Sequence, residues 1–309
     1  MTIRRLLLVS ALACAVGAGP AIADCGKVVM SEPGWTDIMA TTAATSIVLE
    51  AMGHEVETQM LSLPVSFAGL ASGEIDIFLG LWMPSMEADI APYRAAGTID
   101  ILRANLEGAK YTLATNAAGA ALGIRDFKDI AAHKDALEGR ILGIEPGNDG
   151  NRLILTMLEA DQFGLGGFEL QESSEQGMVA EATRATRGDR PVVFLGWEPH
   201  PMNTAMDLTY LTGGDEVFGP DFGGATVWTT TRKGYGAECP NVGRLLGNLS
   251  FTLPMESAIM GAILNDGAEP AEAARAWMVA NPDSWKPWLD GVTTIDGGDA
   301  LAAVTAALN

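Results

Sequence analysis

The stretch Pro191-Val-Val-Phe-Leu-Gly-Trp197-Glu-Pro-His-Pro-Met202 decides the interpretation of this chain. Its apolar run, residues 192–195, predicts a short buried strand that ends at Gly196. Two prolines then predict an irregular loop. In open α/β sheets, ligands bind beyond the carboxyl ends of the strands. We therefore expect Trp197 to face a binding crevice.

Two earlier stretches have the same order of residues. Ile75-Asp-Ile-Phe-Leu-Gly-Leu-Trp82-Met-Pro84 is an apolar run followed by a tryptophan and a proline, and Val28-Val-Met-Ser-Glu-Pro-Gly-Trp35 is a looser case. Any one tryptophan is more often a core residue, but three in the same position relative to a strand favour one shared site. Aromatic faces attract cations, and cages of them bind quaternary ammonium groups.

The order of predicted elements indicates an α/β protein with two lobes. After the first strand, Thr36 or Asp37 is expected to cap a helix that runs to Met52. Strands and helices then alternate, which is typical of a mainly parallel sheet flanked by helices. We expect lobe 1 to comprise residues 24–110 plus 213–309 and lobe 2 to comprise residues 111–212.

The first 23 residues have the features of a signal peptide. Arg4 and Arg5 precede an apolar run, residues 6–16, and Ala21-Ile-Ala23 fits a cleavage site that would leave Asp24 as the first residue. The alternative is a lipid anchor on Cys14, for which the preceding leucine is one place late. We expect an exported protein of the periplasm, with no later span of the membrane.

Composition restricts the class of partner. The chain has 309 residues and a formal net charge of −20, so it repels nucleic acid and anionic membrane surfaces. An acidic surface is compatible with a cationic ligand. We expect a monomer without nucleic acid as a partner.

Cysteine usage predicts one disulfide. Cleavage of the signal peptide would leave Cys25 and Cys239, and two cysteines in an oxidising compartment favour a bond between them over two free thiols. Two thiols and three scattered histidines do not have the spacing of a metal site. We therefore expect neither a metal nor a cofactor.

The mature chain resembles the substrate-binding proteins of ABC importers for quaternary ammonium compounds, the glycine betaine/choline/carnitine group. Within this group it is most similar to choline-binding members. The resemblance is carried by five segments: Gly34-Trp-Thr-Asp37, Gly80-Leu-Trp-Met-Pro84, Lys110-Tyr111, Pro146-Gly-Asn-Asp-Gly150 and Gly196-Trp-Glu-Pro-His-Pro-Met202.

The resemblance implies the type II fold of periplasmic binding proteins, in which a hinge joins two lobes that close on the ligand. It implies a permease, with its ATPase, as partner. It also implies an aromatic box of Trp35, Trp82, Tyr111 and Trp197, with Asp37 and Asn148 as polar partners. A quaternary ammonium has no N–H donor, so ring faces, methyl contacts and a nearby anion must hold it. His200 is expected to orient the loop after Trp197.

Three alternatives remain at this stage. The chain could bind glycine betaine or another betaine, or it could present a quaternary ammonium ligand to a receptor as a sensor. It could also be an exported hydrolase with His200 as a base, although it contains no Gly-x-Ser-x-Gly motif. We predict a binding protein for choline, with acetylcholine bound more weakly, and no enzymatic activity.

Overall fold

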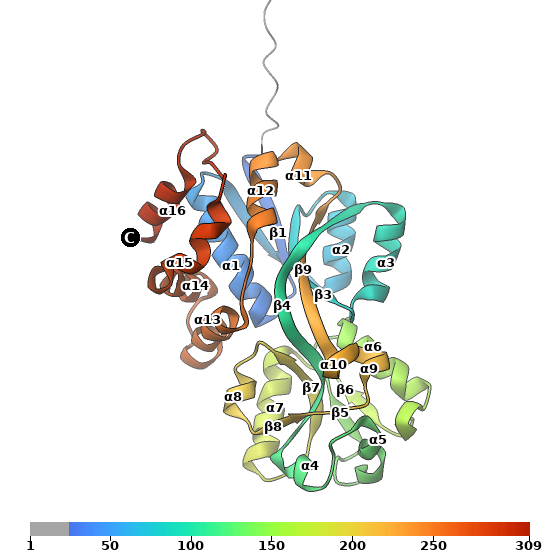
Figure 1. Cartoon of the computed structure of the whole chain (residues 1–309). Coiled ribbons are helices and arrows are strands. Elements are labelled where there is room, and N and C mark those ends of the chain that lie inside the picture. Colours follow the sequence, from blue (N-terminus) through green and yellow to red (C-terminus); the bar gives the residue numbers. More distant parts are fainter. Residues whose placement is uncertain (1–24) are drawn as a thin grey trace, which may run out of the picture.

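The computed structural model describes residues 25–309 and has two lobes, one above the other in Figure 1. The predicted signal peptide, residues 1–23, lies outside the described residues. The strands are β1 (Lys27–Glu32), β2 (Glu55–Met60), β3 (Ile77–Met83), β4 (Ile99–Asn116), β5 (Arg140–Leu142), β6 (Glu169–Gln171), β7 (Val193–Glu198), β8 (Leu208–Tyr210) and β9 (Gly224–Arg232). Within residues 25–309, no helix is long and apolar enough to cross a membrane.

Helices cover both lobes. Those of the upper lobe are α1 (Thr36–Ala51), α2 (Leu63–Ser72), α3 (Glu87–Ala96), α11 (Tyr235–Glu238), α12 (Pro240–Asn248), α13 (Leu253–Asp266), α14 (Pro270–Ala280), α15 (Pro282–Trp285) and α16 (Ala300–Leu308). Those of the lower lobe are α4 (Ala117–Ala121), α5 (Phe127–Ile130), α6 (Asp149–Glu159), α7 (Glu175–Arg187) and α8 (Met202–Ala205). Helices α9 (Asp215–Phe218) and α10 (Pro220–Gly223) lie at the junction of the lobes, just before β9. Short 3₁₀ helices span Ala131–His133, Gln162–Gly164 and Lys286–Leu289.

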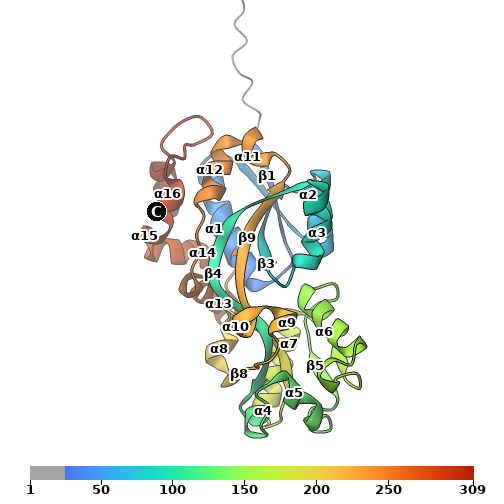
Figure 2. The same cartoon turned by 45° about the vertical axis from the view of Figure 1, so that its right-hand side comes forward.

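Two long strands connect the lobes. The strand order is β2-β1-β3-β9-β4-β7-β5-β6, and β8 pairs with β4. The outer strands pair in parallel, β1 with β2 and β3 in the upper lobe and β5 with β6 and β7 in the lower lobe. Strands β4 and β9 pair antiparallel and run from one lobe into the other (Figure 2). The predicted two-lobe α/β fold is therefore confirmed, with this strand pair as the connection.

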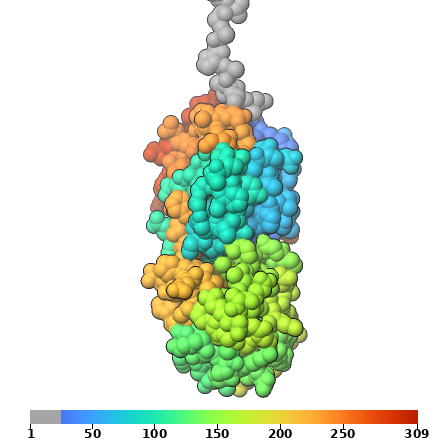
Figure 3. All heavy atoms as spheres, turned by 90° about the vertical axis from the view of Figure 1, so that its right-hand side faces the viewer, coloured from blue at the N-terminus to red at the C-terminus, as the bar shows by residue number. Residues whose placement is uncertain are grey.

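The lobes touch on the side that carries α3 and α6. Arg152 of α6 donates to the Asp89 carboxylate of α3, at 2.7 Å from Nη2, and to the carbonyl of Ser85 at 2.8 Å. In Figure 3 the teal segment of the upper lobe and the lime-green segment of the lower lobe meet across this boundary. Because each partner belongs to a different lobe, these bonds exist only while the lobes are close together.

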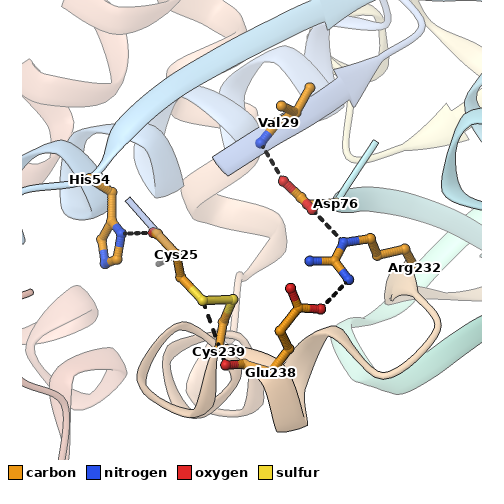
Figure 4. Close-up of a disulfide and its surroundings, with 7 residues drawn as sticks. All are labelled: Cys25, Val29, His54, Asp76, Arg232, Glu238 and Cys239. Atoms are coloured by element: carbon orange, nitrogen blue, oxygen red, sulfur yellow. Dashed lines mark hydrogen bonds and ion pairs between the residues drawn. A yellow bond between two sulfur atoms is a disulfide. The ribbon is translucent and has the colours of Figure 1, made fainter. Parts of the chain in front are cut away.

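The predicted disulfide is confirmed. Cys25 and Cys239 are bonded, with their Cα atoms 5.8 Å apart (Figure 4). Cys25 precedes β1 and Cys239 lies between α11 and α12, so both belong to the upper lobe. Beside them, Asp76 accepts hydrogen bonds from Val29 N–H and from Arg232 Nε, at 2.9 and 2.6 Å. These contacts join β1, the segment before β3, and β9.

The structure corrects two local expectations. Trp82 and Trp197 are the second-last residues of β3 and β7, so they lie inside the strands and not after them. Helix α1 begins at Thr36 with Trp35 as its N-cap residue, which makes no side-chain capping bond. Neither Thr36 nor Asp37 occupies the capping position.

Candidate functional site

A small cavity lies where the two lobes meet. The described residues that line it come from both lobes: Trp35, Asp37, Trp82, Met86, Tyr111, Ile144, Asn148, Asp149 and Trp197. All six residues that the sequence singled out for ligand contact are among them. His200 is not.

Strand pairing brings the aromatic residues together. Tyr111 of β4 is the direct partner of Trp197 in β7, and side chains opposite each other on paired strands project from the same face. The ring centroids of Tyr111 and Trp197 are 6.3 Å apart, and those of Tyr111 and Trp82 are 5.8 Å apart. Trp35 enters from the start of α1, and its indole N–H donates to Glu145 at 2.8 Å. The four rings therefore face one small space from different directions.

The start of helix α6 closes the lower wall. Asn148 is the N-cap residue, and its Oδ1 accepts from the N–H groups of Gly150 and Asn151 at 2.8 and 3.2 Å. The same oxygen accepts from the Tyr111 hydroxyl at 3.0 Å. A Cβ on Gly150 would overlap the phenolic oxygen of Tyr111, so glycine is required for this approach. Three donors therefore hold the amide oxygen of Asn148 in place.

Two buried carboxyl groups line the cavity, one from each lobe. Burial, together with the charge of Glu175, raises the pKa of Asp37 to about 7, although the Trp82 indole acts in the opposite direction. Burial and the charge of Asp89 raise the pKa of Asp149 to about 7. A cation in the cavity would favour the ionised form of both groups.

Asp149 is a cavity residue that the sequence reasoning missed. The Ser85 hydroxyl lies near it but donates to the carbonyl of Trp82 at 3.3 Å. Among the described residues, Oδ2 of Asp149 has no hydrogen-bond donor. The available signal was its position in the chain, directly after Asn148, which the family resemblance assigns to the ligand site. Met86 and Ile144 complete the apolar lining and had no comparable signal.

His200 lies behind Trp197. Its ring centroid is 4.9 Å from that of Trp197, and its Nδ1 accepts from the N–H of Met202 at 2.9 Å. The Asn203 side chain donates to the carbonyl oxygens of Trp197 and His200, at 2.8 and 2.9 Å. This geometry suits a residue that orients the loop after Trp197.

The family model described as OpuAC, the substrate-binding domain of ABC-type glycine betaine transport systems, matches residues 26–280. The chain belongs to this family. Its members bind substrates for ABC transporters and are not enzymes, which confirms the prediction of a binding protein and rules against the hydrolase reading.

Solved structures agree with this assignment. One is described as an ABC-transporter choline binding protein in complex with choline; it is 62% identical, with 93% of this chain and 99% of that chain covered, and the TM-score is 0.91. The unliganded semi-closed form of an ABC-transporter choline binding protein has the same identity and coverage and a TM-score of 0.85. A lactococcal OpuAC in its closed form with glycine betaine is 25% identical, with 85% and 98% covered and a TM-score of 0.77.

Proposed function

We propose that this member of the OpuAC family is the choline-binding protein of an ABC importer. The residues proposed to contact choline are Trp35, Asp37, Trp82, Tyr111, Asn148, Asp149 and Trp197. The aromatic rings would surround the trimethylammonium head, and the amide and carboxyl groups would receive the hydroxyl tail. Acetylcholine, which has no hydroxyl donor, should bind more weakly.

The charge of the lining carries this proposal. Of the described residues that line the cavity, two carry carboxyl groups and none is a lysine or arginine. A zwitterion such as glycine betaine needs donors for its carboxylate, whereas two buried acids repel it. Choline is a net cation and can donate its hydroxyl proton to an acid or share hydrogen bonds with an amide. Cation–π contacts to desolvated rings, about 2 kcal/mol each, would supply the affinity.

The proposed cellular setting follows from the function. Choline would be delivered in the periplasm to a permease with its ATPase, by a monomer whose signal peptide, residues 1–23, has been removed. The lobes are proposed to divide as 24–110 plus 213–309 and 111–212, with β4 and β9 as the hinge. A sensor that presents the same closed form to a receptor is the second candidate, since both roles use the surface of that form.

Calorimetric titration of the exported protein with choline, acetylcholine, glycine betaine and carnitine tests the proposal. We expect choline to bind most tightly, in the micromolar range or better, about 8 kcal/mol of binding free energy. Tighter binding of glycine betaine than of choline would reject the proposed ligand. Uptake of labelled choline by cells that lack the protein would then separate the two roles. Loss of uptake would indicate an importer, and unchanged uptake would indicate a sensor.

A further inference from the structure

One buried carboxylate joins the lobes beside the cavity without lining it. Glu175, the first residue of α7, has a side chain that is 1% exposed. Its Oε2 accepts a hydrogen bond of 2.8 Å from the backbone N–H of Thr36, and its Oε1 lies 3.0 Å from Nε2 of His200. Thr36 belongs to the upper lobe, and Glu175 and His200 belong to the lower lobe. Glu175 is absent from the described residues that line the cavity.

The partners of Glu175 are neighbours of the proposed ligand contacts. Thr36 lies between Trp35 and Asp37 in the chain. His200 packs against the ring of Trp197 on the opposite wall. A single side chain therefore connects the upper wall of the cavity to its lower wall.

Helix α1 depends on the other lobe for an acceptor at its start. The first N–H groups of a helix have no partner within the helix, and this end carries a partial positive charge. Trp35, in the N-cap position, makes no side-chain bond there. Glu175 supplies a negatively charged acceptor from 139 positions away in the chain. When the lobes separate, this bond must break.

We propose that Glu175 is a positioning residue that stabilises the closed lobes and thereby slows release of the bound cation. The inference rests on the proposed function, because it takes choline as the ligand. Wild-type protein that fails to bind choline would reject the proposed function. If the wild type binds choline but replacing Glu175 leaves the rate of choline release unchanged, only this inference is rejected.

The hydrogen-bond directions make Glu175→Gln a sharp test. Nδ1 of His200 accepts from Met202 N–H, so Nε2 carries the proton and donates to Glu175. Both carboxylate oxygens therefore face donors. A glutamine has the same shape but places an NH₂ group against one of those donors. In a buried site this mismatch is costly, and it arises only when the lobes are closed.

The experiment measures choline association and dissociation by stopped-flow tryptophan fluorescence. Glu175→Gln should dissociate about tenfold faster or more, with association within about twofold of wild type. Spin labels on the outer surfaces of the two lobes should show an added population at longer distance in the choline-saturated variant. A dissociation rate less than threefold faster, or a loss confined to association, would overturn the proposal.

Glu181→Gln is the matched control for charge. Glu181 lies on the same helix, and its carboxylate pairs with Arg184 and Arg190 of its own lobe. The Glu181→Gln variant should release choline at a rate within about twofold of the wild type. An increase equal to that of Glu175→Gln would show a general charge effect and overturn the proposal.

A second pair of variants tests the same bond from the other lobe. Thr36→Pro removes the N–H donor at the first helical position, where proline is tolerated, and Trp35 before it is already extended at ψ 134°. Thr36→Ala removes the same side chain and keeps the N–H. Choline should leave Thr36→Pro several-fold faster than Thr36→Ala. Equal rates would overturn the proposal even if Glu175→Gln failed to fold.

Discussion

The indole N–H of Trp35 donates a 2.8 Å hydrogen bond to the carboxylate of Glu145, so an acid of the lower lobe holds an aromatic residue of the upper lobe. Burial raises the pKa of Glu145, and the Trp35 N–H counteracts this effect. The bond sets the orientation of the Trp35 ring only while the lobes are together. The Arg152–Asp89 ion pair between α6 and α3 also joins the two lobes.

Removing this acceptor should weaken ligand binding. Glu145→Ala leaves the indole N–H of Trp35 without its partner in the closed form, and a hydrogen bond to a charged group contributes about 1.5–3 kcal/mol. We expect choline affinity to fall about tenfold in calorimetric titrations. Glu172→Ala is the control, because Glu172 accepts from Asn151 within the lower lobe. Equal losses in both variants would contradict a specific role of the Trp35 bond.

The tryptophans should separate into two groups by their effects. Trp197→Ala should weaken choline binding by 10- to 100-fold, from about 1.5–3 kcal/mol of lost cation–π and methyl contacts. Trp285 is buried in the C-terminal helices and donates to the carbonyl of Met278 at 2.8 Å. Trp285→Ala should instead lower the free energy of unfolding by about 3–5 kcal/mol. Chemical denaturation and calorimetry on both variants check this, and a reversed pattern would mean that the wrong aromatic residues were assigned to the ligand.

Asp37 should control the choice between choline and glycine betaine. Asp37→Asn removes a carboxylate that attracts the net cation and repels the anionic end of a betaine. Choline affinity should fall about tenfold or more, and the ratio of choline to glycine betaine affinity should narrow. Titration of both ligands measures the ratio. If choline affinity barely changes, Asp37 only stabilises the first turn of helix α1 and does not act on the ligand.

Choline affinity should rise with pH between about 5.5 and 7.5. The pKa values of Asp37 and Asp149 are raised to about 7, so the empty cavity holds protons near neutral pH. A bound cation favours the ionised acids and lowers both pKa values in the complex. Binding therefore releases protons, and affinity increases with pH until the empty protein is itself deprotonated above about 7.

Calorimetry in buffers of different ionisation enthalpy detects this proton release directly. Near pH 6.5 the number of protons released should be smaller for Asp37→Asn than for the wild type, because only Asp149 still titrates in the cavity. An affinity that is constant from pH 5.5 to 7.5 in the wild type would contradict the coupling.

The disulfide should stabilise the fold without affecting the ligand. It closes a loop between positions 214 apart, for which the chain-entropy model gives about 5 kcal/mol as an upper bound. Both cysteines lie in the upper lobe, outside the set of described residues that line the cavity. The double variant Cys25→Ser, Cys239→Ser should melt at a lower temperature and keep choline affinity within about threefold. A large loss of affinity with an unchanged melting temperature would contradict this assignment.

The amino-acid sequence alone determined the class of fold and most of the candidate cavity. Alternating strands and helices predicted two α/β lobes, and the repeated apolar run before Trp82 and Trp197 predicted that these rings share one site. Both inferences depend on periodicity and position within a few residues, which a sequence displays directly. The strand bounds were less accurate, because a tryptophan at the end of a strand has the same pattern as one just after it.

Only the tertiary structure decided which distant groups face each other. As the first residue of α6, Asp149 has the sequence position of an ordinary first-turn acid, and only folding places it in the cavity with no donor to Oδ2 among residues 25–309. Glu175 lies 139 positions from Thr36, and nothing local to either residue indicates the bond between them. Contacts between residues of different lobes form because β4 and β9 connect the lobes and the lobes close against each other. Burial then strengthens the interaction of groups that the sequence leaves far apart, because a desolvated charge has no water to replace a missing partner.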